Sequence, residues 1–331
     1  MRRGLIAPSS IASTLPPAAA RECRGRSRVE PPIRLLLPAE PWERQVKNSL
    51  AALRTLWHPH QKLWNWDLAD TLKDSGHVRL ADWLIPVDSV LLAVRVLFRR
   101  AVRLGPFAFR RKAKSSMRVL YVDCGVHTEG MQIRLFHEWF SGLVNLQILA
   151  FEASPRHFPE ATANLADIPN LDLRNIALVG PDFGSPTIKL YRTGGNGKGD
   201  SLFSERGHEF DEVPTGRLSD FIRETPADLV ILRMNIEGAE EYVIEDLVDA
   251  GTLDRIAAFY GMWDDLSKID ANRDKAFRDV LHRHGVRTLT FNDRDARHPL
   301  RHWAIRLDID TVLQLGKQGN RRVKISSPVH S

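Results

Sequence analysis

Residues 117–130 have the sequence MRVLYVDCGVHTEG, and this stretch decides the fold. It begins with a run of apolar and β-branched residues, 118–124, which has the length and composition of a buried strand. The run closes with Asp123 and Cys124, and Gly125 follows, so an acid and a flexible backbone position lie at the strand end. Such an ending is typical of parallel α/β sheets, in which ligands bind beyond the carboxyl ends of the strands.

Short apolar runs and segments with helical spacing alternate through the following residues. The predicted strands are 118–124, 146–152, 171–179, 229–236 and 256–261, and the predicted helices between them are 133–140, 158–165, 218–224, 239–249 and 273–284. Strand and helix in regular alternation predict an open, parallel α/β sheet.

Two further strands, 286–291 and 302–308, are predicted with only residues 292–301 between them. A helical crossover between parallel strands needs about a dozen residues or more, so we expect an antiparallel hairpin here. The predicted fold class is therefore α/β, with a mostly parallel seven-stranded sheet whose last strand is antiparallel, preceded by a helical N-terminal region. This is the Rossmann-like layout of class I methyltransferases, whereas dinucleotide dehydrogenases commonly keep that sheet fully parallel.

Two acids at strand ends predict a nucleoside site. Asp123 ends the first strand beside Gly125, and Glu152 ends the second, where an acid can hydrogen-bond both hydroxyls of a ribose. A GxGxxG fingerprint is missing from the first loop, which argues against NAD(P) as the ligand.

Four stretches resemble the FkbM-type methyltransferases, over about residues 117–310. They are YVDCGVHTEG (121–130), AFEASP (150–155), NIAL (175–178) and RMNIEGAE (233–240), in the order of the family's motifs. The resemblance implies a class I fold that uses S-adenosyl-L-methionine and usually methylates a hydroxyl oxygen. It leaves the first 116 residues unexplained.

The resemblance also implies roles for individual residues. Asp123 and Gly125, with Gly130 at the end of the same loop, would face the methionine part of the cofactor; Glu152 would bind the ribose, and Asn175 to Ala177 would lie near the adenine. Arg233, Asn235 and Glu237 would line the floor where cofactor and acceptor meet.

This chain departs from the family pattern at three positions. Glu129 stands where the first loop usually has Gly, and Gly130 follows one residue late; Arg233 and Asn235 replace the usual Lys and Asp. The loss of a carboxylate at Asn235 puts a catalytic role for that position in doubt.

Transfer to a hydroxyl oxygen requires that the hydroxyl lose its proton, and three residues are candidate bases. Glu237 follows the fourth strand, His127 lies in the first loop, and His208 lies in a Gly-rich segment that could cover the acceptor. Each has a structural alternative: Glu237 can cap the next helix or pair with Arg233, His127 can shape the loop, and His208 can belong to a surface connection. We expect no metal site.

Composition and charge divide the chain. Residues 1–116 carry 21 Lys and Arg against 9 Asp and Glu, whereas residues 117–331 carry 26 against 32. The acidic body is unsuited to nucleic acid. Two cysteines, Cys23 and Cys124, exclude a disulfide scaffold, and no apolar run approaches the length of a transmembrane helix.

We accordingly expect four parts: a disordered basic tail (1–39), a helical, Trp-rich and basic region (40–116), a methyltransferase-like domain (117–316) and a basic C-terminal tail (317–331). The arginines of the first tail also resemble those of an organellar transit peptide. The expected location is cytoplasmic, with peripheral membrane contact as an option.

That option rests on residues 87–114. Val87, Val90, Leu91, Val94, Phe98 and Ala101 form an apolar stripe, and Arg95, Arg99 and Arg103 follow another face. Such a helix can lie on an anionic membrane, or it can pack on the body with its arginines in solvent.

Taken together, these patterns predict an S-adenosylmethionine-dependent methyltransferase whose acceptor is a hydroxyl of a sugar, glycolipid or secondary metabolite. Two alternatives are a degenerate methyltransferase fold that serves as a binding or scaffold protein, and an NAD-linked oxidoreductase. Cofactor binding separates them, and the predicted terminal hairpin argues against the oxidoreductase.

Overall fold

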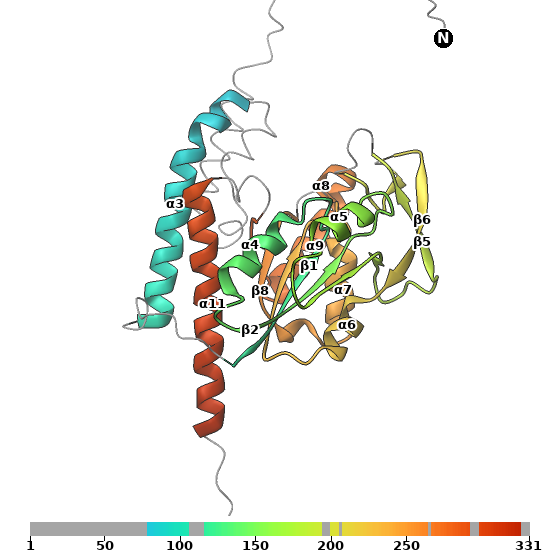
Figure 1. Ribbon diagram of the computed structural model, residues 1–331. Coiled ribbons are helices and arrows are strands. Elements are labelled where there is room, and N and C mark those ends of the chain that lie inside the picture. Colours follow the sequence, from blue (N-terminus) through green and yellow to red (C-terminus); the bar gives the residue numbers. More distant parts are fainter. Residues whose placement is uncertain are drawn as a thin grey trace, which may run out of the picture. The chain divides into compact units, whose positions relative to one another are not determined.

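The central strand is the one predicted from the opening stretch: β1 (Arg118–Cys124) lies in the middle of a parallel sheet in the computed structural model (Figure 1). The structure describes residues 78–105, 116–193, 199–204, 207–263, 266–291 and 298–325. All of them belong to one unit, residues 51–331. The predictions made for residues 1–77, a disordered basic tail followed by the start of a helical, Trp-rich region, lie outside the described ranges.

The main sheet has the order β3-β2-β1-β7-β8-β9, and every neighbouring pair is parallel. Its other strands are β2 (Asn145–Phe151), β3 (Leu171–Arg174), β7 (Leu229–Met234), β8 (Ile256–Gly261) and β9 (Thr288–Leu289). The strands β1, β2, β7 and β8 were all predicted from the sequence to within two residues. Their apolar runs are continuous because a parallel sheet is buried on both faces.

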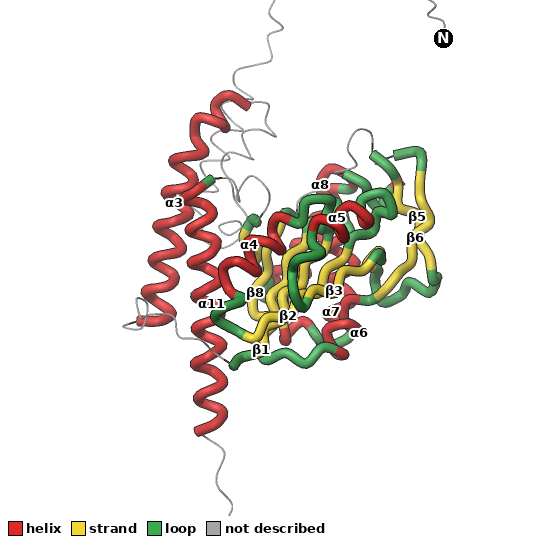
Figure 2. Tube along the Cα trace, viewed as in Figure 1, coloured by secondary structure: helices red, strands yellow, loops and turns green. Residues whose placement is uncertain are grey.

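Helices cover both faces of this sheet (Figure 2). On one face lie α4 (Met131–Phe140), α5 (Phe158–Asn164) and α11 (Pro299–Ile325), and on the other lie α6 (Leu218–Glu224), α7 (Glu240–Asp249) and α9 (Ala271–Arg283). Two short helical segments, η3 (Leu253–Arg255) and α8 (Leu266–Ile269), flank β8. Alternate residues of β1 supply the two cores, with Val119 and Tyr121 on the α4 side and Leu120 and Val122 on the α7 side.

The predicted antiparallel hairpin is wrong. In the described part of the chain the main sheet has six strands, and the last one, β9, is parallel to β8. Residues 302–308 lie in the helix α11 instead. The buried residues Arg301, Ile305, Asp308, Ile309 and Val312 recur three or four apart, which is the spacing of a helix face, and this pattern outweighs the short alternation at 302–308.

The predicted third strand, 171–179, is two strands. Asn175 separates β3 from β4 (Ala177–Leu178), which pairs with a hairpin of β5 (Thr187–Tyr191) and β6 (Phe210–Gly216) in a small second sheet, β4-β6-β5. Neither strand of this hairpin was predicted from the sequence, because both carry mostly exposed or half-buried side chains.

The predicted basic helix is α3 (Val78–Leu104), and it packs along α11. Its arginines are not all solvated, as one alternative supposed: Arg99 Nη1 lies 3.2 Å from Asp308 Oδ1, and Arg100 Nη1 lies 2.9 Å from Asp310 Oδ2. Arg100 also donates to Thr311 Oγ1 at 3.0 Å. The helix therefore turns these two arginines inward.

Helix α11 extends to Ile325, so residues 317–325 of the predicted C-terminal tail are helical. No helix within the described ranges combines the length and the apolar character that crossing a membrane requires.

Loss of one partner of the Arg100–Asp310 pair should destabilise the fold strongly, because both side chains are about 95% buried. Substitution Asp310→Asn leaves a buried guanidinium without its counter-charge, and we expect the free energy of unfolding to fall by about 3–5 kcal/mol. Urea denaturation followed by circular dichroism measures this. The exposed pair Arg223–Asp220 gives the control Asp220→Asn, expected to cost about 1 kcal/mol or less. Equal losses in the two variants would contradict the assignment.

Candidate functional site

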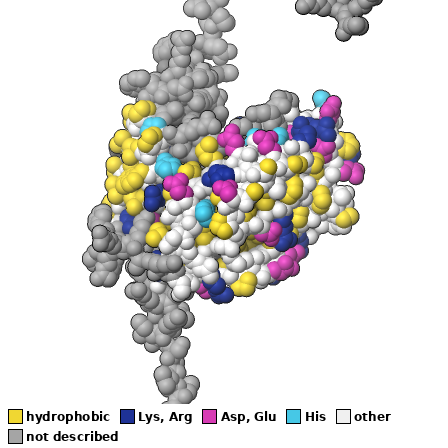
Figure 3. Space-filling model, viewed as in Figure 1, with side chains coloured by type: hydrophobic (Ala, Val, Ile, Leu, Met, Phe, Trp, Pro, Cys, Tyr) yellow, Lys and Arg dark blue, Asp and Glu magenta, His cyan; other side chains and the backbone are white. Residues whose placement is uncertain are grey.

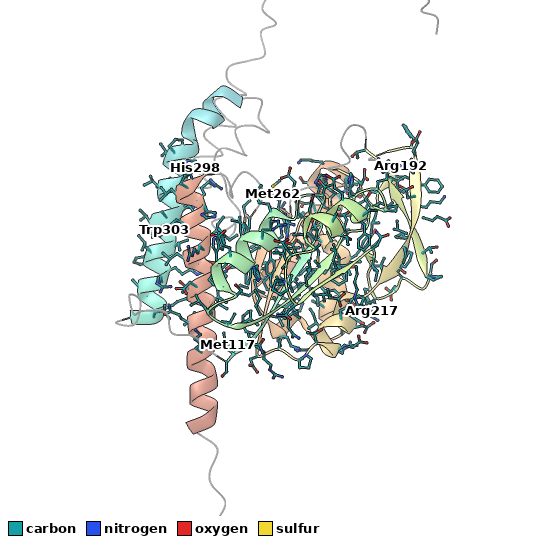
Figure 4. All side chains as sticks on the ribbon, viewed as in Figure 1. Met117, Arg192, Arg217, Met262, His298 and Trp303 are labelled. Carbon is teal, nitrogen blue, oxygen red and sulfur yellow. The ribbon has the colours of Figure 1, made fainter. Side chains whose placement is uncertain are left out.

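A cavity of about 290 Å³ lies at the carboxyl ends of the central strands. Met262, which follows β8 and is labelled in Figure 4, lies in its wall. The loop after β1 contributes Gly125, Val126 and His127, and the ends of β2 and β7 contribute polar side chains. The remaining lining residues are Cys124, Gln132, Phe151, Glu152, Ala153, Ser154, His157, Ile176, Ala177, Leu178, Leu190, Asp200, Ser201, Leu202, Arg233, Asn235, Ile236, Glu237 and Ala239.

The strand order places the cavity at the switch point between β1 and β7. The chain leaves β1 toward β2 and leaves β7 toward β8, in opposite directions along the sheet. Gly125 lets the two central loops meet there. Its φ is +88°, and a Cβ at this position would lie 2.1 Å from the carbonyl oxygen of Asn235. The Gly125 amide donates to Phe151 O at 2.9 Å, and the Asn235 amide donates to Cys124 O at 2.9 Å. Only glycine fits this approach.

Glu152 is held at the cavity by backbone groups. Its Oε2 accepts from the His127 amide at 2.6 Å and its Oε1 from the Ser154 amide at 2.9 Å. Burial raises the pKa of the Glu152 carboxyl, and these two amides act in the opposite direction. Asn175 does not line the cavity; its Nδ2 donates to the carbonyls of Glu152 and Ala153, at 2.8 and 3.0 Å, and so fixes the backbone beneath the acid.

Asp123 lies beside the cavity but is not among its lining residues. Its Oδ1 is 2.8 Å from Arg233 Nη1, in register on the neighbouring strand, and its Oδ2 accepts from Tyr121 Oη at 2.9 Å. Arg233 does line the cavity and also donates to Gly125 O at 2.9 Å. The charge of Asp123 is therefore directed at Arg233.

Glu237 lines the cavity from a strained turn after β7. Its φ is +56°, which is uncommon for a residue other than glycine. Ser201 Oγ donates to the Glu237 carbonyl at 2.8 Å. The carboxylate that binds the backbone ahead of α7 belongs to Glu240, which accepts from the amides of Ile236 and Gly238 at 2.8 and 2.9 Å. Glu240 thus performs the capping that the sequence analysis had considered for Glu237.

Two histidines flank Glu152. The rings of His127 and His157 lie 4.8 Å apart, and both line the cavity. Burial lowers the pKa of His157, and the neighbouring His127 lowers it further. Asp200 Oδ2, 3.9 Å from His157 Nε2, has the opposite influence.

Three buried polar atoms at the cavity have no hydrogen-bond partner among the described residues. They are Ser154 Oγ, His157 Nε2 and Asn235 Oδ1, each from a lining residue. Buried polar atoms in folded proteins are nearly always satisfied, so these three atoms can bind water or the polar groups of a ligand.

The structure brings six of the ten predicted site residues to the cavity: Gly125, His127, Glu152, Ala177, Asn235 and Glu237. The other four are Asp123, Gly130, Asn175 and His208. Gly130 begins α4 with φ +56°, where a Cβ would lie 2.5 Å from Leu165 Cδ1, and the exposed His208 precedes β6.

Several lining residues were not predicted from the sequence, among them Gln132, Ser154, His157, Asp200 and Met262. Ser154 and His157 follow Glu152 by two and five residues, so the polar character of that strand end was an available signal. Asp200 reaches the cavity only through the fold of the second sheet. Within the described residues, no group of three or more His, Cys, Asp or Glu side chains is placed to hold a metal ion.

A scan against models of protein families gives no match to this chain. A search of curated proteins also gives no match. Functional inference therefore depends on the site.

The turn that carries Glu237 should depend on Glu240. Substitution Glu240→Gln replaces one of two acceptor oxygens by an amide nitrogen that faces a backbone donor, and we expect a loss of about 1–3 kcal/mol in the free energy of unfolding. Chemical denaturation measures the loss. Glu245→Gln, on the exposed side of the same helix, is the control and should not destabilise the chain. A stable Glu240→Gln variant would contradict this role.

The lowered pKa of His157 predicts how the stability of the fold depends on pH. Because the unfolded chain binds this proton more readily than the folded chain, stability should fall as the pH drops below about 6.5. His157→Gln should therefore lose less stability than the wild type between about pH 7.5 and about pH 5.5, in denaturant titrations at each pH. His208→Gln, at an exposed position, is the matched control. An unchanged acid-side loss in His157→Gln would refute the prediction.

Proposed function

We propose that this chain is an S-adenosyl-L-methionine-dependent methyltransferase that acts on a hydroxyl oxygen of a sugar, glycolipid or secondary metabolite. The observation that carries the proposal is the charge of the cavity. The motif resemblance in residues 121–240 supports it independently.

The cavity lining is acidic. Glu152, Asp200 and Glu237 contribute carboxylates, and Arg233, which contributes a guanidinium, is already paired with the buried Asp123. Asp200 lies 2.5 Å from Arg156. Three acidic side chains, of Glu152, Asp200 and Glu237, thus line the cavity together with the guanidinium of Arg233. An acidic pocket favours a ligand with a sulfonium and an ammonium group over one with a negatively charged pyrophosphate.

The fold by itself does not choose between these ligands. The fully parallel order β3-β2-β1-β7-β8-β9 is shared with dinucleotide-binding proteins, and the terminal hairpin that argued against them is not found. The loop after β1 favours S-adenosyl-L-methionine over a dinucleotide. Gly130 packs on Leu165 instead of lining the cavity, and exposed Glu129 precedes α4, where a pyrophosphate would need glycines and a positive helix end.

The residues present fit the cofactor. Glu152 would accept from the ribose hydroxyls, and the apolar side chains of Ile176, Leu178, Leu190 and Leu202 would surround the adenine. Ser154 Oγ and Asn235 Oδ1 are available for its polar groups. The cavity, at about 290 Å³, is near the lower end of the range for small-molecule sites, about 300–1,000 Å³.

When bound, the cofactor supplies a methyl group that its sulfonium already activates. The protein then has to orient the acceptor hydroxyl, exclude water and take up one proton. Glu237 and His127 both line the cavity and are the candidate bases, and such a base contributes about 10²–10⁴-fold. His208 lies outside the cavity wall, so we no longer assign it this role.

One observation favours the alternative, a methyltransferase fold that serves as a binding or scaffold protein. Asp123, expected to face the methionine part, is instead buried against Tyr121 and Arg233. A scaffold would have no need of an acid directed at the ligand.

Calorimetric titration of the full chain with S-adenosylhomocysteine tests the proposal, with NAD⁺ titrated in parallel. We expect a dissociation constant on the order of micromolar for S-adenosylhomocysteine and no binding of NAD⁺. Glu152→Gln should weaken binding about 10–100-fold, because a charge-assisted hydrogen bond contributes about 1.5–3 kcal/mol. Asp172→Asn, exposed on the adjacent strand β3, is the control and should bind normally.

The other possible results of this titration each point to a different alternative. A folded chain that binds neither ligand would establish the scaffold alternative, and binding of NAD⁺ alone would establish a dinucleotide site. Binding that survives Glu152→Gln unchanged would place the ligand elsewhere.

A further inference from the structure

Helix α3 exposes an apolar face. Val94 is 57% exposed, Phe98 71% and Val102 67%, and Figure 3 shows hydrophobic side chains gathered along this helix. The exposed apolar residues recur at helical spacing over more than four turns: Val87, Val90, Leu91, Val94, Leu97, Phe98 and Val102. A contiguous apolar surface of this kind on a folded protein marks an interaction site.

The apolar stripe is exposed because another side of α3 packs against α11. Ser89, Ala93, Val96 and Arg100 form its buried side against α11, where Arg100 meets Asp310. Rotating the stripe inward would remove Arg100 from its buried counter-charge, at a high cost in free energy. The ion pairs therefore hold the apolar stripe on the outside.

The charges near the apolar stripe indicate that its partner is anionic. Between Asp88 and Asp123 the chain has no acidic residue and nine Lys and Arg. Of these, Arg99 and Arg100 are paired with carboxylates of α11, and Arg103 lies with Arg99 near Asp308, on the side of α3 that faces the body. Arg95 lies beside the stripe on α3 itself. The described surface thus combines exposed apolar side chains with Arg95 at their border, in a stretch of sequence that has no acidic residue between Asp88 and Asp123.

We propose that this face of α3 binds an anionic lipid membrane in the plane of its interface. The stripe would insert among the acyl chains, and Arg95 at its border would extend to the headgroup phosphates and contribute about 1 kcal/mol. A second copy of this chain is the poorer occupant, because a two-fold interface would bring the basic border against itself. The proposal stands independently of the enzymatic function.

Flotation of the full chain with vesicles tests the proposal. We expect binding to phosphatidylcholine vesicles that contain phosphatidylserine, little binding to pure phosphatidylcholine, and weakening as the ionic strength rises above about 0.1 M.

Two variants separate the apolar and the ionic contributions. The double variant Val94→Ser/Phe98→Ser should bind about tenfold or more weakly, since it removes two large apolar side chains from the stripe. Arg95→Gln should weaken binding about fivefold. The matched controls are Phe210→Ser, an exposed aromatic on β6, and Arg223→Gln on α6, and both should bind like the wild type.

Light scattering and thermal unfolding without lipid complete the test. If the wild type is a dimer and Val94→Ser/Phe98→Ser is a monomer, the face binds a second copy and the proposal is wrong. If the double variant unfolds at a lower temperature and the wild type binds no vesicles, another segment of this chain covers the face, and the proposal is equally wrong. A stable, monomeric wild type that ignores anionic vesicles also overturns it.

Discussion

The buried ion pair between Asp123 and Arg233 is the interaction on which the centre of this protein depends. It joins the carboxyl-terminal ends of β1 and β7, the two strands from which the sheet extends in opposite directions. Both side chains are at least 97% buried, so neither charge can be removed alone without a large cost. Arg233 also donates to the carbonyls of Gly125 and Phe291, which ties the first loop and the end of the chain segment after β9 to the same point.

That arrangement determines the character of the cavity beside it. Because Asp123 neutralises Arg233, this guanidinium adds little positive charge to a lining that also contains Glu152, Asp200 and Glu237. The backbone supports each acid separately, through the amides of His127 and Ser154 for Glu152 and through the turn held by Glu240 for Glu237. Acidic side chains held in this way are in position before any ligand arrives, as the proposed cationic nucleoside would require.

A second set of buried ion pairs organises the other side of the molecule. Asp308 and Asp310 on α11 bind Arg99 and Arg100 of α3, and Tyr260 Oη donates to Asp308 at 2.9 Å. Burial raises the pKa of Asp308, whereas Arg99 and Tyr260 favour its ionised form. Amphipathic helices usually bury their apolar side. In α3 the arginines that pair with the carboxylates of α11 are buried instead, and the apolar side faces outward.

The sequence by itself determined the strands β1, β2, β7 and β8, the helices between them and the acid at the end of β2, because continuous apolar runs and helical spacing are local signals. Tertiary structure alone decided the rest. It made residues 302–308 helical by burying one face of α11, brought His157 and Asp200 to the same cavity from separate elements, and turned Asp123 toward Arg233. These outcomes depend on which distant charge or surface a residue meets, and that information is not contained in the spacing of residues along the chain.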